Sequence, residues 1–91
     1  MENKEKIENF IKNNHLHFSG FGSDLNSDCT IISGFALFSG VEINELIDIL
    51  SEQEEWSGEA EEELQRVFEF AENNNYGTFW STEDAKKQYK F

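Results

Sequence analysis

Carboxylates dominate the side chains of this chain that can do chemistry. The 91 residues include 19 Asp and Glu against 7 Lys and Arg, which gives a formal net charge of -12. Residues 13–65 contain no Lys or Arg, and the acids of this stretch carry the whole net charge because the flanking segments each sum to zero. Ordinary protein surfaces intersperse both signs. A one-sign stretch repels itself, so we expect a basic partner to compensate it.

The acids are densest over residues 42–63, which we call the acidic block. On a helix, outward carboxylates on successive turns lie about 5–6 Å apart, which is comparable with the phosphate spacing of about 3.4 Å along a nucleic-acid strand. The alternative is a merely solvated acidic face. The tryptophan of the block is interpreted as an interface anchor or as a ring folded onto the helices. The predicted partner-binding residues are Glu45, Asp48, Glu52, Glu54, Glu55, Trp56, Glu59, Glu62 and Glu63.

Two histidines and one cysteine are the candidates for a metal or nucleophile site. His15 and His17 share one face of an extended segment, and Cys29 with Asp24 or Asp28 follows later. Zinc requires three or four converging ligands, so an H-x-H pair with a distant thiol is a weak signal. No nucleophile-elbow, Walker A or dinucleotide-binding pattern appears. We therefore predict no metal, no cofactor and no catalytic residue.

Composition also limits the environment of the chain. A strongly negative protein is repelled by DNA, RNA and anionic lipid, so direct binding to nucleic acid or a membrane is not expected. The single cysteine forms no intramolecular disulfide and fits a reducing compartment. The longest apolar stretch, Ile31–Val41, is interrupted and too short to span a bilayer. With no leader-like segment at the start, a soluble cytoplasmic protein is predicted.

Apolar spacing predicts a mainly α fold, a compact bundle of about four to five helices in one domain covering residues 1–91. The i, i+3, i+4 pattern favours helices over residues 3–14, 42–52 and 58–73. Ser57 is the predicted N-cap of the last of these. A short terminal helix is expected after a capping box formed by Ser81 and Asp84.

Two segments are ambiguous. Residues 29–39 fit a buried helix capped by Ser27 or Asp28, which we favour, although their β-branched content also allows a strand. Residues 15–19 alternate weakly, as in a short β element. Residues 20–28 are predicted to be a loop by their Gly, Asn, Asp and Ser content.

With the acidic block in view, the chain resembles the small acidic phage proteins that act against host defence, the anti-CRISPR and DNA-mimicking anti-restriction proteins. The resemblance lies in size, charge and a one-domain build, with Gly22–Ile31 and Phe79–Tyr89 as signature-like stretches. It implies an inhibitor that blocks the nucleic-acid channel of a nuclease complex. Some members of the class block assembly or a conformational change instead.

These observations predict an inhibitor that binds a basic nucleic-acid-handling protein of the host, with a CRISPR effector as the leading candidate. The first alternative is an immunity protein or antitoxin that neutralises a nuclease toxin, which would use the same electrostatics. The second alternative is a small structural or assembly protein whose acidity only confers solubility. Whether the protein is a monomer or a dimer is left open.

Overall fold

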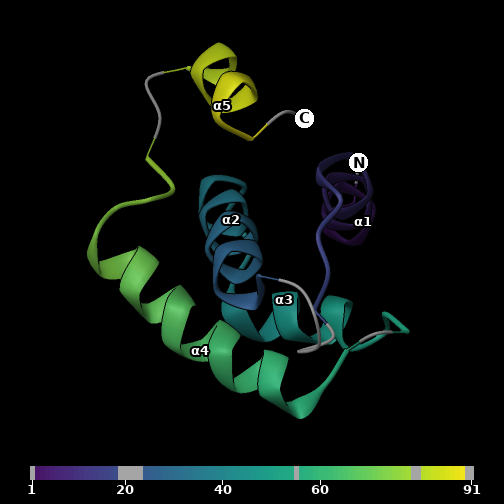
Figure 1. Cartoon of the computed structure of the whole chain (residues 1–91). Helices are drawn as coiled ribbons and strands as arrows, with labels where there is room; N and C mark the ends of the chain where they lie inside the picture. Colours follow the sequence, from purple (N-terminus) through teal and green to yellow (C-terminus); the bar gives the residue numbers. More distant parts are fainter. Residues whose placement is uncertain (1, 19–23, 55, 79–80, 90–91) are drawn as a thin grey trace.

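A computed structural model describes residues 2–18, 24–54, 56–78 and 81–89, without the side chains of residues 82 and 89. The described residues form five helices and no strand, which confirms the predicted mainly α bundle (Figure 1). The helices are α1 (Asn3–Asn14), α2 (Leu25–Phe38), α3 (Ile43–Leu50), α4 (Gly58–Asn73) and α5 (Thr82–Tyr89).

α2 is the central helix of the bundle. It packs most extensively against α4 and also contacts α1, while α3 contacts both α1 and α4 (Figure 1). On the α1 side, Phe35 of α2 stacks on Phe10. Because apolar residues occupy more than one side of α2, its sequence lacks a clean amphipathic stripe, which explains why residues 29–39 were ambiguous. They are helical throughout to Phe38, as we favoured.

The start of α2 corrects the predicted loop over residues 20–28. The helix begins at Leu25, and its N-cap is Asp24 instead of Ser27 or Asp28. The Asp24 carboxylate accepts a hydrogen bond from the backbone N–H of Ser27 at 3.2 Å. Polar residues in a first helical turn have the composition of a loop, so the first turn of α2 was not recognised from the sequence.

Helices α1 and α4 have the predicted bounds, because each combines an apolar stripe with recognisable ends. The N-cap of α4 is confirmed, since Ser57 Oγ accepts a hydrogen bond from the Ala60 backbone N–H at 3.2 Å. α3 is shorter than the predicted 42–52 because residues 51–54 continue as turns. Ahead of α5, the Asp84 backbone N–H donates to Ser81 Oγ at 3.3 Å, and the Ser81 hydroxyl donates to the Asp84 carboxylate at 3.2 Å.

The β element suggested near residues 15–19 does not form over residues 15–18, and residue 19 lies outside the described residues. His15 adopts a left-handed conformation with φ 54° and ends α1, and the Leu16 N–H bonds the Ile11 carbonyl at 3.1 Å. This is the hydrogen-bond pattern of a Schellman C-cap. The alternation was a true burial pattern, since Leu16 and Phe18 enter the core, but no described strand lies beside them.

A core of apolar side chains from α1 to α4 joins the bundle. It contains Ile7, Ile32, Leu46 and Leu64, each fully buried, one from each helix. α5 lies beyond the end of α2 in Figure 1 and buries Ala85. None of the helices in the described ranges combines the length and apolarity needed to cross a membrane.

Candidate interaction surface

The acidic block lies where α3, the connection that follows it and the start of α4 meet, at the lower right of Figure 1. Continuity of the chain places these three segments together. Their carboxylates differ in their neighbours, however, and fall into three groups. Two contact α1, one contacts α2, and the others that the structure describes form no ion pair with a described cation.

Glu45 and Glu52 contact the first turn of α1. The Asn3 side-chain amide donates to Glu45 Oε1 at 3.1 Å, and Lys4 Nζ lies 2.8 Å from Glu52 Oε2. The hydrogen bond and the charge of Glu52 raise the pKa of Lys4 above its ordinary value. A helix N-terminus also carries a partial positive charge that favours nearby carboxylates. Of the three predicted acids on α3 or just after it, two therefore have a role inside the fold.

Glu63 connects α4 to α2. The Asn26 side-chain amide donates to Glu63 Oε1 at 2.8 Å, and Arg66, one helical turn later, forms an ion pair with the same oxygen. The Asn26 hydrogen bond is the main cause that lowers the pKa of the Glu63 carboxyl, and Arg66 acts in the same direction. This acid is thus held ionised by its own chain and is less available to a partner.

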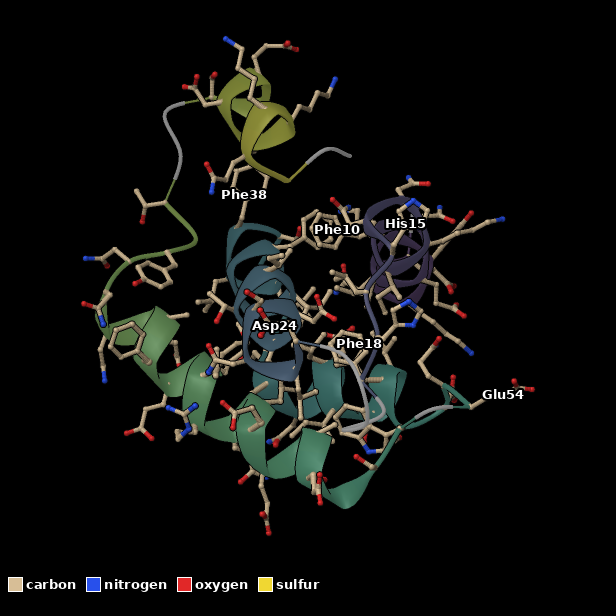
Figure 2. The ribbon with its side chains drawn as sticks, viewed as in Figure 1. Phe10, His15, Phe18, Asp24, Phe38 and Glu54 are labelled. Carbon is tan, nitrogen blue, oxygen red and sulfur yellow. The ribbon has the colours of Figure 1, made fainter. Side chains whose placement is uncertain are left out.

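Four further predicted carboxylates are exposed: those of Asp48, Glu54, Glu59 and Glu62. No described Lys, Arg or His forms an ion pair with any of them. Figure 2 shows Glu54 extending outward from the tip of the connection between α3 and α4. The remaining predicted acid, Glu55, lies outside the described residues.

Trp56 is half-buried. Its ring packs against the core, and the ring centroid lies 6.3 Å from that of Phe18 with the planes inclined by 58°. A tilted aromatic pair at this distance is favourable. The indole ring therefore packs on Phe18 and the core, as in the alternative of a ring folded onto the helices, while part of its surface stays accessible.

The histidines and the cysteine do not converge. Cys29 is fully buried in α2, whereas His15 and His17 are exposed. Burial, with smaller effects of Glu63 and Asp28, raises the pKa of the Cys29 thiol to about 12. Over the ranges that the structure describes, no group of three His, Cys, Asp or Glu side chains is placed to hold a metal ion.

Sequence reasoning missed one surface feature. Phe70 and Tyr76 are 53% and 42% exposed and meet edge to face, with centroids 5.7 Å apart. Tyr76 therefore does not lie in the core. Phe79 and Trp80, the aromatic residues that follow in the sequence, lie outside the described residues. The position of Phe70 off the apolar stripe of α4 was the available signal.

Comparison with known proteins gives no family assignment. No protein-family model matches the chain, and no curated protein or solved structure matches it either.

Proposed function

We propose that this protein is an inhibitor that binds the basic surface of a nucleic-acid-handling protein, with a CRISPR effector as the leading candidate. One observation carries the proposal. Residues 13–65 have no Lys or Arg, and the described cations that reach this stretch from outside pair only with Glu52 and Glu63. Asp48, Glu54, Glu59 and Glu62 remain uncompensated on neighbouring segments.

Such a surface suits association with a cationic groove. A single-sign patch raises the rate of diffusional encounter with an opposite patch and repels partners of its own sign. Most of the affinity then comes from a few packed contacts, while the surrounding charges orient the two proteins relative to each other. The proposal assigns no catalytic residue and no cofactor, and it places the protein in the cytoplasm with its target.

A charge-reversal experiment with an internal control tests the proposal. One variant carries Glu59→Lys and Glu62→Lys in the acidic block. Its control carries Glu69→Lys and Glu72→Lys, which lie on the same helix with the same spacing and the same change in charge. All four side chains are exposed. Wild type and both variants are immobilised and exposed to lysate from bacteria that carry CRISPR and restriction systems, and captured proteins are identified by mass spectrometry.

We expect wild type and the control to capture a basic nucleic-acid-handling protein that added nucleic acid displaces and that salt releases. The block variant should lose this protein while keeping its helical circular dichroism. Equal retention by both variants would contradict a role for the acidic block. Capture that nucleic acid does not displace would contradict binding at a nucleic-acid groove.

A further inference from the structure

A cavity of about 430 Å³ lies beside the acidic connection, on the side formed by the chain that leaves α1. Its size is within the range of ligand-binding pockets. Figure 2 shows Phe18 on the inner side of this region and Glu54 at its outer edge. The described residues that line the cavity are Ile11, Leu16, His17, Phe18, Gln53 and Glu54.

The lining divides into an apolar floor and a polar rim. Ile11, Leu16 and Phe18 are buried core residues, so the floor is held rigidly by the packing of the bundle. Gln53 is half-buried and Glu54 is exposed. The cavity therefore offers hydrocarbon below, and the Gln53 amide, the Glu54 carboxylate and the exposed His17 at its mouth.

The chemistry of the rim narrows the class of occupant. A purely apolar occupant would cover the Gln53 amide and the Glu54 carboxylate without pairing them, which is unfavourable. An anion would be repelled by Glu54 and by the net charge of -12. Lysine and arginine side chains match both parts, because they bury a hydrocarbon stem while the charged head stays at the surface.

We propose that this cavity accepts a lysine or arginine side chain of the protein partner. The stem lies on Leu16 and Phe18, and the cationic head meets the Glu54 carboxylate. This inference rests on the proposed function, because it names the chemical group with which a basic partner engages the acidic block. It explains how a diffuse negative surface gains one specific anchoring contact.

A peptide titration tests the cavity without any partner protein. A capped Gly-Arg-Gly peptide is added to the ¹⁵N-labelled protein, and its twin carries citrulline, which has a nearly identical shape and no charge. We expect amide shifts of Leu16, His17, Gln53 and Glu54 with the arginine peptide and clearly smaller shifts with the same concentration of the citrulline peptide.

Matched variants distinguish binding of the peptide in the cavity from its nonspecific electrostatic attraction to the acidic protein. Glu54→Gln should weaken binding roughly two- to fivefold, the range of an exposed ion pair, whereas Glu62→Gln, the same change in charge away from the cavity, should leave it unchanged. Gln53→Arg, which supplies the chain's own cation, should remove the shifts.

Amide shifts of equal size with the citrulline and arginine peptides would overturn the proposal that the cavity recognises a positive charge. Shifts spread evenly along the acidic block, with equal effects of Glu54→Gln and Glu62→Gln, would overturn the cavity as the site. The titration can succeed even if the lysate capture finds no basic partner, and the capture can succeed even if the peptide does not bind in the cavity. The two proposals are therefore distinguishable.

Discussion

Lys4 Nζ lies 2.8 Å from Glu52 Oε2, and this ion pair joins the first turn of α1 to the chain just after α3. The cation comes from outside the stretch that lacks basic residues, so it relieves part of the repulsion among the acids of that stretch. Arg66 does the same for Glu63 from the other side. The fold thus compensates Glu52 and Glu63, while Asp48, Glu54, Glu59 and Glu62 form no ion pair with a described cation.

Removal of the Lys4 charge should change the stability of the protein little and should strengthen its binding to a basic partner. In Lys4→Met the aliphatic stem is kept and the ion pair is lost. Because the side chains of Lys4 and Glu52 are 52% and 58% exposed, water already screens the pair, and the urea midpoint should move only slightly. Affinity for a basic partner should rise because Glu52 is released. A large fall in the midpoint, or weaker binding by the variant, would contradict this assignment.

Gly77 marks a close approach between the chain after α4 and the end of α2. A Cβ at this position would lie 2.5 Å from Leu37 Cβ and 2.7 Å from the backbone nitrogen of Phe38. Backbone atoms cannot move aside without disturbing α2, so Gly77→Ala should destabilise the fold by about 1–3 kcal/mol.

Gly58 supplies the matched control for Gly77. A Cβ on Gly58 would meet nothing within 4 Å, and the residue begins α4. Gly58→Ala should therefore be neutral or stabilise by up to about 1 kcal/mol, because alanine loses less conformational entropy in a helix. Guanidinium denaturation measures both variants. Similar changes in the two would show that the contact with Leu37 does not exist in solution.

The Cys29 thiol should react only when the protein opens. It is fully buried, and its pKa of about 12 keeps it protonated and weakly nucleophilic near neutral pH. With an aromatic disulfide reagent, the labelling rate should follow the unfolding equilibrium as denaturant is added. In a Cys29→Ala background, Ser27→Cys places a thiol on the exposed face of the same helix and should react at once. Rapid labelling of Cys29 in the native protein would contradict its burial.

The same thiol gives a dependence of stability on pH. The ordinary thiol pKa is 9.0 and the folded value is about 12, so between these values the folded state holds a proton that the unfolded state has lost. The stabilisation is fully present below pH 9 and falls as pH rises towards 12. Comparison with Cys29→Ala over this range isolates the contribution, because the variant lacks it. An identical pH dependence of the two proteins would contradict the raised pKa.

The sequence predicted those helices whose ends carry local signals. α1 and α4 each carry a single apolar stripe, α4 also has the N-cap hydroxyl of Ser57, and the bounds of both helices were predicted correctly. α2 was harder, because its first turn is polar and its apolar residues face more than one neighbour. At residues 15–18, apolar and polar side chains alternate because an irregular segment places Leu16 and Phe18 in the core. The two-residue period of the pattern cannot distinguish such a segment from a strand.

The sequence predicted which acids make up the candidate surface, but not which of them pair with other residues of the chain. Counting residues located the acidic block, but the contacts of Glu52 with Lys4 and of Glu63 with Asn26 join positions far apart in the sequence. No local pattern indicates such pairs. The cavity beside Glu54 likewise depends on α1 and the connection after α3 lying side by side. The sequence thus supplied the charge, and tertiary structure decides which carboxylates remain available.

A double-mutant cycle on Phe10 and Phe35 should measure how α1 is held to α2. The two rings stack with centroids 3.9 Å apart and planes inclined by 6°. Nearly parallel rings this close gain less from their quadrupoles than offset or edge-to-face pairs, so the coupling energy should be small, about 0.5 kcal/mol. Each single Phe→Leu change should cost more, about 1–3 kcal/mol, because each ring is buried and has further contacts. The cycle cancels those other contacts. If guanidinium unfolding instead gave a coupling of several kcal/mol, the two helices would depend on this one pair, and the packing of α1 against α3 would contribute far less than the structure indicates.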